Sequence, residues 1–200
     1  MKRSVRTPTA GSALQRSGNL LLIIVVSLML VTGTAGQEMP VPVAVQWAIL
    51  SKVLTYDRHL AKPGKEAVVG VLYQPQVRSS VRVKDELTAV IAQLEQPVPM
   101  HFSCTAIPYT SAADLHKALE AVDVLYLAPM RSLDLAAIAI QSRERGKVTV
   151  TGVPAYVELG VAVGIDLLGG KPRVLVNLEA AKGAGADFAS GLLNIAKIVN

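Results

Sequence analysis

The clearest indication of the fold class is the segment Ala67-Val68-Val69-Gly70-Val71-Leu72-Tyr73. It is an unbroken apolar run between Gly64 and Pro75, and three of its residues are β-branched valines. A run of this length and composition predicts a strand that is buried on both faces. Such strands lie inside parallel sheets that helices cover on both sides.

Helix-like and strand-like segments alternate around this run. Apolar residues at helical spacing predict helices over residues 43–60, 83–94, 111–120 and 135–145, and short apolar runs predict strands over residues 100–107, 122–128 and 147–153. This alternation predicts βαβ units in a largely parallel sheet. The apolar face of the first helix consists of Val45, Ile49, Val53, Tyr56 and Leu60, and it is widened by Val43, Trp47, Leu50 and Leu54.

The pattern changes in the C-terminal third. Residues 161–168 and 173–178 are short apolar runs separated by Gly169-Gly170-Lys171-Pro172, which predicts a hairpin. Phe188, Leu192, Ile195 and Val199 then recur at helical spacing and predict a C-terminal helix. The predicted fold class is therefore α/β: a single domain over residues 37–200, with a largely parallel sheet flanked by helices and an antiparallel C-terminal hairpin edge.

The N-terminus has the pattern of a secretory signal peptide. Four basic side chains and no acidic ones precede an apolar run over residues 20–31, and small residues follow at positions 32–36. The apolar run is shorter than the about 20 residues that a membrane-spanning helix needs. Cleavage after Ala35 or Gly36 is therefore favoured over an uncleaved anchor, which predicts a signal peptide over residues 1–36 and a periplasmic location for the rest.

The leader also accounts for the basic charge of the chain. Residues 1–36 hold four of the 20 Lys and Arg, and the remaining 16 face all 15 Asp and Glu. The near-neutral remainder has no cluster of basic and aromatic residues, so no nucleic-acid partner is predicted. Cys104 is the only cysteine, which rules out a disulfide within the chain. Two readings of Cys104 stay open: a buried inert thiol, and an exposed thiol that pairs with another chain.

The sequence shows no constellation of catalytic or metal-binding residues. His59, His101 and His116 lie far apart, and none has a partner at the spacing of metal ligands. No serine has the Gly-x-Ser-x-Gly context of a nucleophile elbow, and residues 164–171 depart from the phosphate-loop pattern. The compact trio Asp57-Arg58-His59 is interpreted as the exposed end of the first helix. No enzymatic activity, cofactor or metal is predicted.

Several segments carry a family resemblance. They are KVLTYDR (52–58), VVGVLY (68–73), DVLYL (123–127), KVTVT (147–151), RVLVNL (173–178) and LLNIA (192–196). In this order they resemble the YfiR-like family of exported bacterial proteins. The resemblance implies an α/β fold, no catalysis and a regulatory role in the periplasm, where the best-known type binds the periplasmic part of a membrane-bound diguanylate cyclase and represses it. The lone Cys104 excludes the disulfide-based redox tuning of some members, and residues 156–170 differ from the family's glycine-rich segment.

Binding is therefore the predicted mode of action. Tyr156, Leu159 and Val161 are the candidate contacts with a membrane-bound signalling protein, of diguanylate cyclase or sensor kinase type, and a homodimer also stays open. The alternative is a periplasmic small-solute-binding protein, whose crevice would lie at the carboxyl ends of the strands, at residues 73–75, 128–130 and 152–154. An exported hydrolase is the third hypothesis, and it lacks a nucleophile–base pair.

Overall fold

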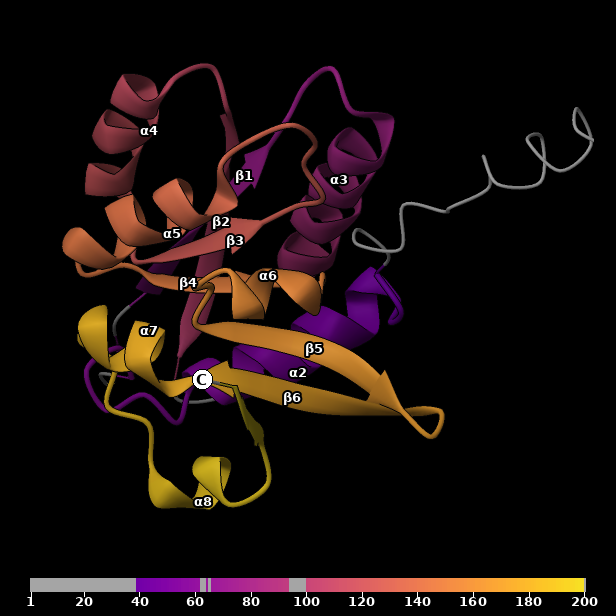
Figure 1. The fold of residues 1–200 in the computed structure, drawn as a ribbon, viewed down its shortest axis with the longest axis vertical. Helices are drawn as coiled ribbons and strands as arrows, with labels where there is room; N and C mark the ends of the chain where they lie inside the picture. Colours follow the sequence, from indigo (N-terminus) through magenta and orange to yellow (C-terminus); the bar gives the residue numbers. More distant parts are fainter. Residues whose placement is uncertain (1–38, 62–63, 65, 94–99, 200) are drawn as a thin grey trace, which may run out of the picture. The chain divides into compact units, whose positions relative to one another are not determined.

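The structure is a computed structural model, and it describes residues 39–61, 64, 66–93 and 100–199. Within these residues, one seven-stranded sheet has the order β2-β1-β3-β4-β5-β6-β7 (Figure 1). The strands are β1 (Glu66–Tyr73), β2 (His101–Pro108), β3 (Val124–Leu127), β4 (Val148–Thr151), β5 (Val163–Leu168), β6 (Lys171–Asn177) and β7 (Lys197–Val199).

The sheet is parallel except at the hairpin. β1 pairs with both β2 and β3, and β3, β4 and β5 follow in parallel register. β5 and β6 are antiparallel, with Val163 opposite Val176, and β7 then adds to the outer edge of β6 in parallel. The predicted α/β class, the largely parallel sheet and the C-terminal hairpin are confirmed.

Helices cover both faces of the sheet and enclose two cores. One core packs α2 and α3 on β1 and β3, and the ring of Trp47 meets that of Phe102 edge to face at 5.2 Å between centroids. The other core packs α4, α5 and α6 on the opposite face. The helices are α2 (Val43–Leu54), α3 (Arg78–Gln93), α4 (Ala112–Ala118), α5 (Leu135–Glu144), α6 (Ala155–Glu158), α7 (Leu178–Gly183) and α8 (Ser190–Leu193), with a 3-10 turn at Leu119–Ala121.

Two helices in the middle of the chain begin with a side-chain cap. Ser111 caps α4, since its side chain accepts a hydrogen bond from the Asp114 amide at 3.1 Å. The Asp134 carboxylate likewise accepts from the Ala137 amide at the start of α5.

Two predicted helices are wrong in extent. The first helix ends at Leu54 instead of residue 60, so Arg58 and His59 do not lie in its last turn. The predicted C-terminal helix over residues 188–199 is a single turn, α8, followed by the strand β7. In both places the chain forms contacts between distant segments: Asp57 makes an isolated β-bridge with Phe188, and β7 uses the free edge of β6.

The predicted signal peptide lies outside the described residues. Among the described helices, none is long and apolar enough to cross a membrane.

Candidate functional site

An open and almost wholly apolar groove runs along the outer face of α2. Its volume is about 530 Å³. We call it the α2 groove. It is lined by Ala44, Val45, Ala48, Ile49, Lys52, Val53 and Tyr56 on one side and by Val174, Leu192 and Ile195 on the other.

The groove exists because α2 is apolar on two faces. Its inner face buries Trp47, Leu50 and Leu54 in the core. Its outer face leaves Val45 42% exposed, and Tyr56 just beyond the helix is 36% exposed. Packing on the sheet requires only one apolar face, so the second, outer apolar face of α2 has the composition of a surface that another molecule covers.

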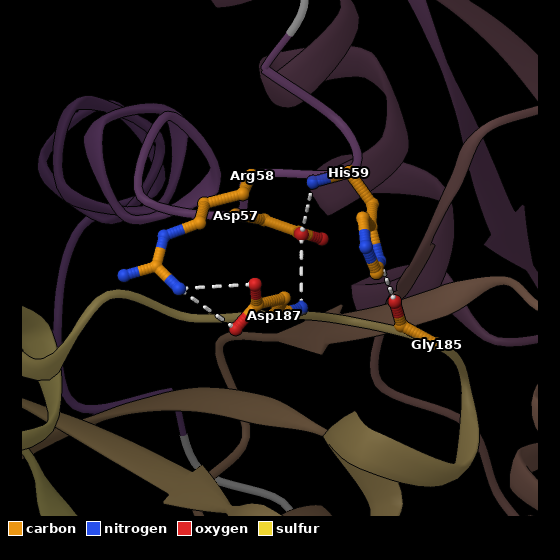
Figure 2. A network of polar contacts seen from close by, with 5 residues as sticks. All are labelled: Asp57, Arg58, His59, Gly185 and Asp187. Atoms are coloured by element: carbon orange, nitrogen blue, oxygen red, sulfur yellow. Dashed lines mark hydrogen bonds and ion pairs between the residues drawn. The ribbon is translucent and has the colours of Figure 1, made fainter.

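The far wall of the groove is held by a polar network that we call the Asp57 latch (Figure 2). The Asp57 carboxylate oxygen Oδ1 accepts hydrogen bonds from the amides of His59 at 3.0 Å and Asp187 at 3.1 Å. Arg58 Nη1 contacts both carboxylate oxygens of Asp187, at 3.3 and 3.1 Å. His59 Nδ1 lies 2.6 Å from the Gly185 carbonyl oxygen, so this ring nitrogen carries the proton and donates it. The latch joins the end of α2 to residues 185–187.

Within the latch, Asp57 is the buried member. Asp57 is 2% exposed, whereas the side chains of Arg58 and Asp187 are 65% and 44% exposed. The trio predicted to be an exposed helix end is therefore a tertiary contact built around one buried carboxylate. A backbone hydrogen bond lies next to the latch, since the Ala189 amide donates to the Tyr56 carbonyl oxygen at 3.0 Å. Ala189 immediately precedes α8.

The latch and the core together place α8 opposite α2. Leu192 is 1% exposed and anchors α8, while Ile195 just after it is 70% exposed. Apolar surface continues along the sheet beside the groove: Leu167 shares the face of Ile165, and Ile198 is in register with Val176. The site is therefore an apolar surface formed by segments far apart in the sequence.

Lys52 carries the single charge among the described residues that line the groove. Its side chain is exposed, and no ion pair joins it to any of the described residues. None of the described lining residues is a carboxylate.

The structure separates the three residues predicted to contact a partner. Tyr156 and Val161 are core residues, 2% and 0% exposed, and Leu159 is 46% exposed. The Tyr156 hydroxyl accepts from the Met130 amide at 2.9 Å and donates to the Met130 carbonyl at 3.1 Å, so it holds the loop after β3. Only Leu159 is available for direct contact in this conformation.

The carboxyl ends of the central strands are tied together by the protein's own side chains. Gln46 and Tyr126 are fully buried there, and the Tyr126 hydroxyl donates to Gln46 Oε1 at 2.9 Å. Burial raises the pKa of Tyr126 well above its usual value. A Cβ atom on Gly152 would lie 1.9 Å from Gln46 Oε1, so any larger residue here would displace the Gln46 side chain from its hydrogen bond with Tyr126. At the neighbouring ends of β1 and β3, Gln74 Oε1 accepts from the Arg131 amide at 2.8 Å.

The described part of the chain holds no candidate metal site: within it, no group of three or more His, Cys, Asp or Glu side chains could hold a metal ion. Cys104 is half-buried on β2, and burial raises the pKa of its thiol, while a hydrogen bond with Thr88 acts in the opposite sense. A raised pKa lowers the thiolate fraction, which favours the inert reading of Cys104.

The fold and the groove define an α/β protein with a surface suited to binding. Residues 67–197 match the YfiR/HmsC-like family model (DUF4154), and the chain therefore belongs to this family. The family resemblance seen in the sequence is confirmed. No curated protein matches the chain.

Solved structures of other proteins share the fold at low sequence identity. An ABC domain in complex with L-Trp from Streptococcus pneumoniae has a TM-score of 0.57 at 14% identity, over 79% of this chain and 60% of its own. A conserved domain protein from Vibrio cholerae and the ligand-free, open form of a substrate-binding protein with adhesive properties from Clostridium difficile both have TM-scores of 0.54 at 15% identity, over 80% of this chain. The chain spans 60% of the length of these proteins, and the likeness concerns the fold alone.

Proposed function

We propose that this protein is an exported, non-catalytic regulator that binds the periplasmic part of a membrane signalling protein, of diguanylate cyclase or sensor kinase type, through the α2 groove. The observation that carries the proposal is the exposed apolar face of α2 in a member of the YfiR/HmsC-like family. Apolar side chains gathered on one surface are typical of protein interaction sites.

The groove offers a substantial gain on binding. Fully burying an isoleucine side chain stabilises a complex by about 1.5–3 kcal/mol. Ile195 is 70% exposed, so a partner that covers it gains about 1–2 kcal/mol from this residue. Val45 and Tyr56 add to this gain in the same groove.

Export is part of the proposal. A basic leader, a short apolar run and small residues around position 35 support cleavage of residues 1–36 and a periplasmic location. Mass spectrometry of the protein purified from its host tests this step. A mature N-terminus at Gly36 or Gln37 is expected, and an intact N-terminus on cytoplasmic protein would contradict it.

Cyclic-di-GMP output tests the regulatory step. The chain is co-expressed with each membrane diguanylate cyclase of its host that has a periplasmic domain, and it is expected to lower the output of one of them. Ala48→Glu places a charge on the exposed outer face of α2 and is expected to abolish the effect. Ile140→Glu is the matched control, because Ile140 is 45% exposed on α5, which packs on the opposite face of the sheet.

The same assay design distinguishes a diguanylate cyclase from a sensor kinase as the partner. If the chain changes no cyclase output, the same pair of variants is applied to sensor kinases with periplasmic domains. If neither class responds and neither class binds, the regulatory proposal is wrong.

Small-solute binding is the second candidate, and it is supported by a fold shared with ligand-binding proteins. A hollow of about 350 Å³ between residues 39–43 and α3, with Arg82 and Glu86 in its lining, could receive a solute. Against this, Gln46 and Gln74 already hold the carboxyl ends of the strands together. Thermal unfolding with a panel of amino acids, nucleotides and sugars tests the candidate, and the absence of any stabilising solute would count against it.

A further inference from the structure

We propose that the α2 groove receives an amphipathic helix of the partner that presents a carboxylate to Lys52. This inference rests on the proposed function, because it names the chemistry of the partner at the same groove. The secondary structure, length and charge of the occupant follow from the residues that line the groove.

The groove fits a helix better than an extended segment. The backbone of α2 satisfies its own hydrogen bonds, so the long wall of the groove offers no partners to an incoming backbone. An extended segment lying there gains no backbone hydrogen bonds from α2 and leaves its N–H and C=O groups to water, whereas a helix satisfies most of them internally. Apolar helices seated in apolar grooves are an established mode of recognition.

The lining residues also set the length of the occupant. They run from Ala44 to Tyr56 at alternating steps of one and three residues, which follows one side of a helix. At 1.5 Å per residue, this stripe is about 18 Å long. A helix of about 12 residues covers it, with apolar anchors at intervals of three and four.

Lys52 sets the charge of the occupant. It is the single charged residue of the lining, and among the described residues no carboxylate pairs with it. A helix that covers the groove partly desolvates the ammonium group, which is unfavourable unless the partner supplies a counter-charge. A carboxylate on the incoming apolar face where it meets Lys52 supplies this counter-charge, and a lysine there is repelled.

A second copy of this chain fits the groove less well. In a two-fold pairing of α2 with itself, the Lys52 side chains of both copies enter one interface. The lining supplies no carboxylate to either of them. A different protein with an acidic group on its helix removes this conflict.

Two synthetic peptides test the charge preference. Both are fluorescent 14-residue helices of leucine, alanine and glutamine, and they differ in one central residue of the apolar face, which is glutamate in one and lysine in the other. Binding to the protein, purified as its host produces it, is followed by fluorescence anisotropy. The glutamate peptide is expected to bind about fivefold more tightly than the lysine peptide.

Variants of the protein test whether Lys52 causes the preference for the glutamate peptide. Lys52→Glu is expected to reverse it and Lys52→Gln to remove it, while circular dichroism confirms that both variants are folded. Ala48→Glu is expected to weaken both peptides, and Ile140→Glu to change neither. Failure of both peptides to bind, or a preference that Lys52→Glu leaves intact, would overturn the inference. So would sedimentation velocity showing a wild-type dimer that Ala48→Glu converts to monomer, because a second copy would then fill the groove.

These outcomes are distinguishable from those of the functional test. If the chain lowers cyclic-di-GMP output but the peptides show no dependence on Lys52, the inference about the occupant is wrong and the regulatory function stands. If the dependence on Lys52 is present but no cyclase or kinase responds, the occupant is supported and the membrane partner is wrong.

Discussion

Removing the Asp57 carboxylate is expected to destabilise the protein strongly. In Asp57→Ala, the amides of His59 and Asp187 both lose the oxygen that accepts their hydrogen bonds. Leaving a buried donor without an acceptor costs about 1–3 kcal/mol. Because these two amides are only partly buried, we expect a combined loss of about 2–4 kcal/mol in the free energy of unfolding.

Two neighbouring variants serve as controls for this prediction. Asp57→Asn keeps an acceptor oxygen but loses its charge, so it is expected to cost about 1 kcal/mol. Arg58→Ala removes an exposed ion pair with Asp187 and is expected to cost no more than about 1 kcal/mol.

Urea unfolding and thermal melts measure the three variants. A loss of 2–4 kcal/mol corresponds to a drop in Tm of roughly 5–15 °C for a domain of this size. If Arg58→Ala destabilised the protein as much as Asp57→Ala, the exposed ion pair and not the buried carboxylate would hold the latch.

Three further predictions concern Gly152, Tyr126 and Cys104. Gly152→Ala is expected to cost about 1–3 kcal/mol in urea unfolding, because its Cβ would collide with Gln46; Gly191→Ala, which meets nothing within 4 Å, is expected to cost less than 1 kcal/mol. Burial raises the pKa of Tyr126, so the unfolded chain loses the phenol proton at about pH 10 while the folded chain keeps it. Stability is therefore expected to fall as the pH rises above about 10, and less steeply in Tyr126→Phe; equal slopes would contradict this. Burial also raises the pKa of the Cys104 thiol, so alkylation by iodoacetamide at pH 8 is expected to be several-fold slower than in the urea-unfolded chain, and equal rates would show an accessible thiol.

The central sheet could be predicted from the sequence because its signals are local. The run over residues 67–73 is β1 with one more residue at its start, and it is paired on both sides as its unbroken apolar composition requires. The hairpin could also be predicted, because two successive glycines are typical of a tight turn between strands. In the structure Gly169 and Gly170 adopt positive φ values of 56° and 76°, which suit glycine.

The ends of the chain could not be predicted because distant contacts decide them. After Leu54, the amides of Tyr56 and Asp57 donate to carbonyls three residues back, which tightens and closes the helix. Asp57 then bonds to a segment 130 residues away, and no local pattern encodes that contact. Near the C-terminus, the strand β7 satisfies the open edge of β6, and this outweighs the helical spacing of Phe188, Leu192, Ile195 and Val199.

The α2 groove could not be predicted from the sequence for a related reason. Val45, Ile49, Val53 and Tyr56 have the spacing of a helix face, but in the structure they line the groove, while Trp47, Leu50 and Leu54 pack inward. Spacing alone does not tell which of two apolar faces packs on the sheet. The sequence feature that could have indicated the groove is the presence of two apolar faces on one helix.

Hydrogen–deuterium exchange of the protein with and without the periplasmic domain of the responding membrane protein shows whether the α2 groove is the binding surface. Slower exchange is expected in residues 44–56, which form one wall of the α2 groove, and in residues 189–196, which contribute Leu192 and Ile195 to the other. Exchange around Leu159 and along β2 is expected to stay unchanged. Protection that falls on residues 155–162 instead, with the groove unaffected, would contradict the account and place the partner at the loop that carries Leu159.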